Sequence, residues 1–329
     1  MIRNKEKEDV FYAKKDFCFS YSSLNKLLFS PSLFYKEYIL FDREVRTDKH
    51  LVEGKLVHCL LFEPENVEDK FSIVPGKAPS DSVRKVLKDM ALHTDAVTLV
   101  SVEDFVILDS LKELNLYQSL KKDEARIAKI RTLDNEPYWK FLSNTNVDVV
   151  DQDTLTKCEE KVEAIKENKD VLALFEQQQS DFELDPIETH AERYLKSELK
   201  DKNFGLHGYI DFYKIDHEKL EVTICDLKTT GKTISDFKDT VDFYNYWLQA
   251  AIYMKLVYDT LGENAEKYTI TFKFVVIDTY KQVYVFDVTP ETMAGWVSGL
   301  EGVIKVGAHH YDKRNYQLPY DFLTGNIKL

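Results

Sequence analysis

Two apolar segments separated by a short polar connector constrain the fold of this 329-residue chain more than any other feature. Residues 205–213 and 220–227 are rich in β-branched and aromatic side chains, and Asp216-His217-Glu218-Lys219 lies between them. Runs of this length and composition around a polar turn predict an antiparallel β-hairpin. The preceding segment 188–195 is a third strand candidate, so the three segments predict an antiparallel meander.

The register of this hairpin places three charged residues together. With the turn centred between Glu218 and Lys219 and no bulge, Asp211 lies directly opposite Asp226. Because side chains alternate along a strand, Asp226 and Lys228 point to the same face. We therefore expect two facing carboxylates with a lysine beside them.

Two carboxylates in this position repel each other and weaken the hairpin unless a cation lies between them. Mg²⁺ prefers oxygen ligands, and the backbone carbonyl of Leu227 is a further candidate ligand. Lys228 could then orient a water molecule or stabilise charge on an attacked phosphorus atom. The competing interpretation is a surface hairpin whose charges face water, which the apolar neighbours Ile210 and Phe212 of Asp211 disfavour.

The rest of the chain divides into a helical and a strand-rich part. Between residues 81 and 179 the apolar residues recur with a period nearer 3.6 than 2, which predicts helices. We expect residues 1–180 to form a mainly helical N-terminal part and residues 181–329 to form a core that carries the facing carboxylates, both integrated in one domain. The core should also contain a helix at 241–261, strands at 268–277 and 282–288, and a closing helix at 290–306.

Three motifs together resemble a known family. They are Gly-x-x-Asp at Gly208 to Asp211, Asp-x-Lys-Thr at Asp226 to Thr229, and a Gln-x-x-x-Tyr motif on the following helix. In this order they resemble the RecB-like branch of the PD-(D/E)XK nucleases. The resemblance implies an α/β (α+β) fold with a restriction-endonuclease-like core, in which helices flank a central mixed β-sheet. It also implies a catalytic set of Asp211, Asp226, Lys228, Gln249 and Tyr253.

The resemblance further implies a set of metal ligands. Gly54-Lys55-Leu56-Val57-His58 is similar to the helical motif in which this branch carries a metal-ligating histidine, so His58 joins Asp211 and Asp226 as an expected ligand. Glu192, in the first strand of the meander, either assists the metal or packs within its strand, and both interpretations stay open. Mg²⁺ is the expected cofactor, with Mn²⁺ as a substitute.

Within this branch the chain resembles RecE-type exonucleases of phages and prophages, through Tyr21-Ser22-Ser23-Leu24 and Ser30-Pro31-Ser32-Leu33-Phe34-Tyr35. The resemblance implies a Mg²⁺-dependent exodeoxyribonuclease that hydrolyses linear double-stranded DNA from its ends in phage-type recombination. It also implies a ring-shaped homo-oligomer and a single-strand annealing protein as partner. Two alternatives stay open: a structure- or site-specific endonuclease of the same fold, and a non-catalytic protein that binds DNA ends.

The composition of the chain bears on which cofactors it could bind and on where in the cell it is expected. The four cysteines are scattered singly, without the short spacing of a zinc or iron–sulfur site, so no iron–sulfur cluster is expected. No apolar run approaches the roughly 20 residues of a membrane span. The mixed-charge N-terminus lacks the apolar core of a signal peptide, which indicates a cytoplasmic protein, in the host cytoplasm if a phage encodes it.

The charge balance weighs against a broadly basic nucleic-acid surface. The net charge is −13, so positive charge would be confined to a groove or to the inside of a ring. Gly231-Lys232-Thr233 imitates the end of a phosphate-binding P-loop. Asp226 occupies the position of the required earlier glycine, so an ATPase is not supported.

Overall fold

The computed structural model describes residues 2–14, 16–43, 48–74, 78–142, 147–175 and 186–327. The chain forms two compact units, one of Met1–Val45 together with Ile165–Leu329 and the other of Arg46–Ala164. The second unit is thus an insertion in the sequence of the first. The boundary expected between residues 180 and 181 falls within 176–185, outside the described residues.

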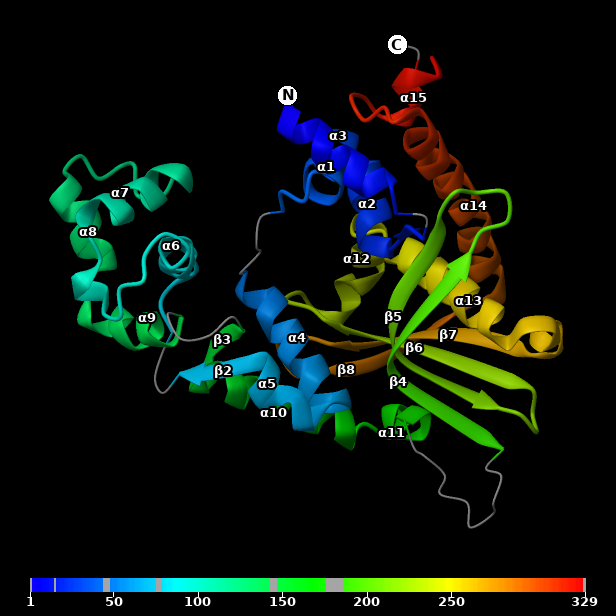
Figure 1. Cartoon of the computed structure of the whole chain (residues 1–329). Helices are drawn as coiled ribbons and strands as arrows, with labels where there is room; N and C mark the ends of the chain where they lie inside the picture. The colour runs from blue at the N-terminus through cyan, green and yellow to red at the C-terminus, as the bar shows by residue number, and fades with distance from the viewer. Residues whose placement is uncertain are drawn as a thin grey trace. The chain divides into compact units, whose positions relative to one another are not determined.

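The first unit is built on a six-stranded mixed sheet (Figure 1). Its strands are β1 (Cys18–Phe19), β4 (Ile187–Glu198), β5 (Gly205–Asp216), β6 (Glu221–Thr229), β7 (Thr269–Ile277) and β8 (Val283–Val288). They follow the order β1-β5-β6-β7-β8, and β4 pairs with β5. The strands β4, β5 and β6 form the predicted antiparallel meander, whereas β6 and β7 run parallel, as do β1 and β5.

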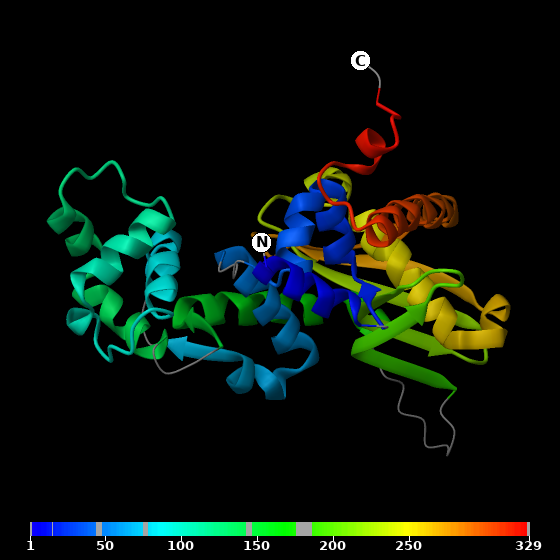
Figure 2. The same ribbon diagram turned by 45° about the horizontal axis from the view of Figure 1, so that its top comes forward.

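Helices pack against this sheet. Helix α13 (Tyr246–Leu261) lies on the sheet, and α14 (Pro290–Lys313) packs against α13 (Figure 2). Leu248 and Leu300 of these helices share the main core with Ile224 of the sheet. The mixed sheet with flanking helices confirms the expected fold class. The other helices of this unit are α1 (Ile2–Tyr12), α2 (Tyr21–Phe29), α3 (Pro31–Phe34), η1 (Tyr35–Ile39), α11 (Lys169–Phe175), η5 (Ile234–Asp236), α12 (Phe237–Phe243), η6 (Gly262–Lys267) and α15 (Tyr320–Leu323).

The second unit is mainly helical and has a core of its own, in which Leu87, Ile107 and Trp139 are fully buried. It also contains a parallel pair of strands, β2 (Phe71–Val74) and β3 (Asp148–Asp151). The sequence pattern does not predict this pair, because each strand has only four residues. The helices are α4 (Lys49–Phe62), η2 (Pro64–Asn66), α5 (Val67–Lys70), α6 (Asp81–Met90), η3 (Leu99–Ser101), α7 (Asp104–Glu113), α8 (Asp123–Ile130), η4 (Leu133–Asn135), α9 (Glu136–Leu142) and α10 (Gln152–Glu167), whose last residues belong to the first unit.

The single helix expected at 241–261 is in fact two helices. Helix α12 ends at Phe243, and α13 begins only at Tyr246. Asn245 between them has a φ of 56°, in the left-handed region that asparagine tolerates better than most residues. The closing helix α14 runs beyond its expected end at residue 306, to Lys313. Among the described residues, no helix combines the length and the apolar composition that crossing a membrane requires.

The β5–β6 hairpin has the predicted register. Phe212 pairs with Cys225, as the predicted position of the turn requires. The ladder ends with this pair, so Asp211 and Asp226 lie one step beyond it. The register therefore brings the two acidic residues to the end of the hairpin.

Strand β5 changes its buried side at Asp211. Ile210 enters the main core before this residue and Tyr213 enters it afterwards, so the alternation of side chains shifts by one position. The β4–β5 ladder skips Glu192 and Asp211 while it pairs the residues on either side of them. Glu192 has a φ of 46°, a left-handed conformation that is strained for glutamate. This irregularity turns Asp211 toward the face of the sheet that carries the core and Asp226.

Candidate active site

Asp211, Asp226 and Lys228 come together just beyond the last paired residues of the β5–β6 ladder. Asp226 is 0% exposed and Asp211 is 7% exposed. The Asp211 carboxylate accepts a hydrogen bond of 2.7 Å from the backbone N–H of Leu227, which holds it against β6. The Lys228 ammonium lies 2.5 Å from a carboxylate oxygen of Asp226. The three charged residues predicted from the register are thus neighbours, with the backbone of Leu227 between them.

Glu192 adds a third carboxylate to this group. One of its oxygens and one of Asp211 lie within 4.8 Å of each other. Its left-handed backbone costs on the order of 1–3 kcal/mol, and residues with such strain persist where the surrounding structure holds them and cluster at functional sites. Between the two interpretations that the sequence leaves open, this position favours a role at the metal over simple packing.

Lys228 is charged despite its burial. Burial lowers the pKa of its ammonium group, but the carboxylates of Asp226 and Asp211 outweigh this effect and raise the pKa above its ordinary value. Its Nζ atom also lies 4.7 Å from the centre of the Tyr246 ring, in cation–π contact. A lysine held in this way donates hydrogen bonds and stabilises negative charge, and it does not act as a base.

Helix α13 brings Gln249 and Tyr253 to the same place. The two residues are four positions apart and share one face of the helix, and Nε2 of Gln249 donates a hydrogen bond of 2.9 Å to the Tyr253 hydroxyl. Burial, followed by the charges of Asp211 and Asp226, raises the pKa of Tyr253 well above its usual range. Tyr253 is therefore a neutral hydroxyl close to both carboxylates.

Gly208 allows the helix to approach this closely. A Cβ atom at this position would lie 2.9 Å from Cε1 of Tyr253 and 3.3 Å from Cδ1 of Leu256. Any larger residue would push α13 away from β5. The first position of the Gly-x-x-Asp motif is thus glycine because of its packing against the helix that carries Tyr253.

Two further tyrosines belong to the site. Burial is the largest cause of the raised pKa of Tyr246, and Asp226 adds to it. Burial is also the largest cause of the raised pKa of Tyr21, with smaller contributions from Tyr246 and Asp226, and the Tyr21 ring lies 6.5 Å from that of Tyr246. Tyr246 has a sequence signal, because it precedes Gln249 by three residues on one helix face. Tyr21, on α2, belongs to the Tyr21-Ser22-Ser23-Leu24 segment that carries part of the family resemblance, but that segment gives no indication of a place at the site.

His58 lies on α4 in the second unit and is half-buried. Its assignment as a metal ligand is based on the sequence motif and stays a prediction. The same holds for the backbone carbonyl of Leu227.

The carboxylates described above form a donor set that fits a hard divalent cation. Glu192, Asp211 and Asp226 carry three negative charges, of which Lys228 offsets one. Buried carboxylates of like charge are costly unless a cation compensates them. Oxygen donors suit Mg²⁺ or Mn²⁺, whereas thiolates would indicate a softer metal.

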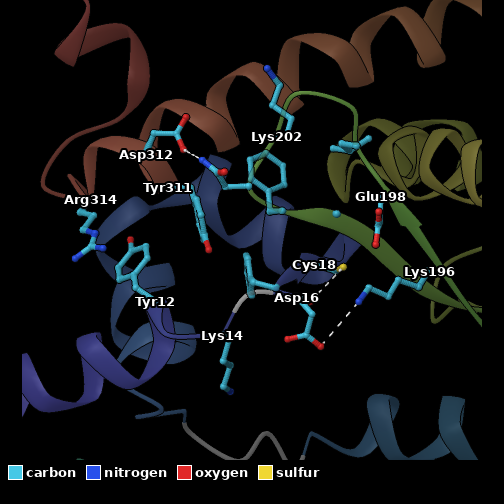
Figure 3. A pocket seen from close by; sticks show the side chains of 15 residues that line it. Tyr12, Lys14, Asp16, Cys18, Lys196, Glu198, Lys202, Tyr311, Asp312 and Arg314 are labelled. Atoms are coloured by element: carbon cyan, nitrogen blue, oxygen red, sulfur yellow. Dashed lines mark hydrogen bonds and ion pairs between the residues drawn. The ribbon is translucent and has the colours of Figure 1, made fainter.

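A cavity of about 600 Å³ lies elsewhere on the first unit, at the other end of β4 and β5 (Figure 3). Its lining residue on β5, Gly205, is six residues from Asp211, or about 20 Å along an extended strand, and its nearest lining residue on β4, Lys196, is four residues from Glu192. Two of its basic side chains have partners nearby: Lys196 lies 3.9 Å from Asp16, and Arg314 lies over the ring of Tyr12. The cavity is separate from the carboxylate centre.

Comparison with known proteins agrees with a nuclease fold. A family model of the PD-(D/E)XK nuclease superfamily matches residues 18–296, a range that contains all the site residues named above, and the chain belongs to this superfamily. The chain is also similar to a solved structure from Eubacterium rectale described as a "putative exonuclease", with 12% sequence identity and a TM-score of 0.48 over 97% of this chain and 91% of that chain. No protein of curated function matches the sequence. Members of the superfamily are hydrolytic enzymes that typically use divalent metal ions.

Proposed function

We propose that this chain is a Mg²⁺-dependent deoxyribonuclease whose active centre is formed by Asp211, Asp226 and Lys228. The observation that carries the proposal is the fully buried Asp226, paired with Lys228 and lying beside a second carboxylate at the end of β6. A buried charge pair without a function would be expensive to maintain. Membership of a nuclease superfamily supplies the class of reaction.

In the proposed site Asp211, Asp226 and Glu192 would hold the cation, and the Leu227 carbonyl and His58, the ligand that the sequence motif predicts, would complete the ligand set. When bound, a divalent cation supplies Lewis-acid activation of water and neutralises phosphate charge. The water oxygen bonds to phosphorus as the P–O ester bond breaks; the attacking water releases a proton to the solvent, and the departing oxygen takes one up from it.

Lys228 acts on the charge of this reaction. Its protonated ammonium orients the water and stabilises the negative charge that builds up on the phosphate oxygens. Gln249 and Tyr253 help to position the carboxylates from the side of α13. The neutral Tyr253 hydroxyl is fixed for this role by its hydrogen bond from Gln249.

We further propose that the enzyme is an exonuclease that starts at the ends of linear double-stranded DNA. The likeness of the sequence to RecE-type enzymes supports this choice, and it also supports a homo-oligomeric ring that works with an annealing protein in phage-type recombination. The alternative is an endonuclease that uses the same centre but admits DNA differently.

The first test removes the centre. Asp226→Ala and Lys228→Ala should each lower the Mg²⁺-dependent degradation of linear duplex DNA by at least about 100-fold, because each removes a charge that acts on the phosphate. Asp287→Ala is the matched control, since this exposed carboxylate on β8 pairs with Lys273 outside the centre. Circular dichroism checks that each variant is folded. Undiminished digestion by either active-site variant would mean that the centre is misplaced.

A second assay separates the modes of cleavage. Linear duplex with labels at the 5′ and 3′ ends should lose one label first, whereas closed circular duplex should stay intact. Ready cutting of circles would replace the exonuclease proposal by the endonuclease one. Binding of DNA ends with no degradation in Mg²⁺ or Mn²⁺ would leave the non-catalytic end-binding protein.

A further inference from the structure

Two exposed aromatic rings lie close to the active centre. Phe243 is 74% exposed and Tyr244 is 46% exposed. Their rings are in edge-to-face contact, with centroids 4.9 Å apart. Large rings that are left in water as a pair indicate a contact surface, because burying them on a partner is favourable.

The pair is connected to the catalytic lysine through one further ring. Tyr244 stacks on Tyr246 with 5.6 Å between the centroids. Tyr246 in turn holds Nζ of Lys228 at 4.7 Å from its centroid. Because every step in this series is a direct contact, the exposed rings lie within reach of the nucleotides that flank a phosphate at Lys228.

The backbone beneath the rings is fixed by α2. The carbonyl of Tyr244 accepts hydrogen bonds from the Tyr21 hydroxyl at 2.5 Å and from Nδ2 of Asn25 at 3.2 Å. The side chain of Asn245 donates to Asn25 at 2.8 Å. The rings therefore extend from a rigid support, and a ligand that binds them loses little free energy in ordering the protein.

The charges around the rings identify the kind of ligand. Nζ of Lys232, in the motif that only imitates a P-loop, lies 5.8 Å from the centre of the Phe243 ring. In the segment 232–242 the exposed Asp236, Asp239 and Asp242 outnumber Lys232 and the exposed Lys238. The ring faces, and not the net charge, must therefore supply most of the affinity. Unpaired bases offer faces of matching size, whereas the bases of an intact duplex are already stacked on one another.

We propose that Phe243 and Tyr244 stack on bases of an unpaired DNA strand next to the phosphate that is cut, and that Lys232 contacts the backbone of this strand. The proposal rests on the nuclease function proposed above and adds a feature of the substrate. The enzyme separates or captures a single strand at its active centre, and the two rings hold this strand while the phosphate lies at Lys228.

The first test measures binding in a background that leaves DNA intact. The full chain with Asp226→Ala is titrated into fluorescein-labelled single-stranded oligonucleotide. Adding Phe243→Ala and Tyr244→Ala should raise the Kd about tenfold or more, since the loss of one stacked base weakens binding by roughly 5- to 150-fold. Phe243→Trp with Tyr244→Phe keeps both rings and should restore the Kd. Phe322→Ala is the control, because this ring is 55% exposed on α15.

Salt and crosslinking make the test specific. The effect of losing the rings should be equal at low and at physiological salt, whereas the effect of Lys232→Ala should shrink as salt rises. An oligonucleotide with 5-iododeoxyuridine, which crosslinks to aromatic rings stacked on it, should attach to Phe243 or Tyr244. Mass spectrometry of the digested protein identifies the attached residue.

Several results would overturn the proposal. They are an unchanged Kd for the double alanine variant, crosslinks only to other segments, or no oligonucleotide binding by the Asp226→Ala protein. A change in oligomer mass with an unchanged Kd would assign the rings to contact between copies of this chain. The nuclease function is judged separately, by degradation of linear duplex by the unmodified protein in Mg²⁺, so a failure of the stacking proposal is distinguishable from a failure of the nuclease function.

Discussion

The strain at Glu192 and the shift of alternation at Asp211 occupy the same point of the β4–β5 pair. A regular strand would carry Asp211 on the face opposite to Ile210 and away from Asp226. The irregularity instead places Asp211 beside β6, where it accepts the hydrogen bond from Leu227. The backbone strain at one residue thus has a chemical result at its neighbour: it assembles the carboxylates.

The closeness of Glu192 and Asp211 predicts opposite effects on stability and activity. In EDTA, Glu192→Gln should stabilise the protein by about 1 kcal/mol, or a few degrees in Tm, because it removes the repulsion between two like charges. The same change should raise the Mg²⁺ concentration that gives half-maximal activity. Thermal unfolding with and without Mg²⁺, together with a Mg²⁺ titration of activity, measures both. A variant with lower stability in EDTA would show that Glu192 packs its strand and does not serve the metal.

At the residue scale, the sequence predicts the carboxylate centre because the position of the turn fixes the register of the hairpin. The polar connector sets the register, and the register brings Asp211, Asp226 and Lys228 to one end of the hairpin. The left-handed Glu192 is not predictable in this way, because a strained conformation depends on the residues that hold it and leaves no local pattern. Tyr21 appears in a motif of the sequence, but its place beside Tyr246 depends on a contact between segments more than two hundred residues apart and leaves no local pattern.

At the level of elements, α13 and β5 together position the side chains of the candidate site. The helix supplies Tyr246, Gln249 and Tyr253 from one face, and the strand supplies Asp211. Gly208 sets the distance between the two elements, because it leaves room for the ring of Tyr253. Helix packing therefore determines how closely the tyrosine hydroxyl approaches the carboxylates.

Gly208→Ala should disturb this contact. Its methyl group would overlap the buried Tyr253 ring, so we expect a loss of about 1–3 kcal/mol in the free energy of unfolding and reduced nuclease activity. Gly302→Ala, on α14, is the matched control because a Cβ there meets nothing within 4 Å. The control should be neutral or about 0.5–1 kcal/mol more stable, as alanine favours the helix. Chemical denaturation compares the two, and equal stabilities would contradict the role of Gly208.

Elements with a strong repeating pattern are predicted better than their ends. The strands at 268–277 and 282–288 match β7 and β8 closely. The predicted helix at 241–261 misses its break, because the apolar pattern continues across Asn245 while the backbone does not. The break is set by the hydrogen bonds of Asn25 and Tyr21, which lie more than two hundred residues earlier.

At the scale of the whole molecule, the acidic net charge bears on how DNA could bind, and the inserted unit bears on how the metal site could be completed. The net charge of −13 leaves little general attraction for DNA, so binding must depend on local contacts. The inserted unit carries His58 on α4, the ligand that the sequence motif predicts.

His58→Ala tests whether the inserted unit takes part in catalysis. Loss of a metal ligand should raise the Mg²⁺ concentration for half-maximal activity by about tenfold or more. His50→Ala is the control, since this exposed histidine lies on the same helix two turns earlier. Equal Mg²⁺ requirements for the two variants would remove His58 from the ligand set.

The pairing of β1 with β5 has a consequence for how the protein is made. Cys18 pairs with Gly205, and all of the inserted unit is synthesised between them. At about 5–20 residues per second, the ribosome needs on the order of tens of seconds to supply this partner. During that time Phe19, Leu24 and Leu27 have no core to enter, while the inserted unit can already fold around its own. The nascent N-terminus is therefore a site at which chaperones would be expected to bind, and the nuclease centre can form only after most of the chain has left the ribosome.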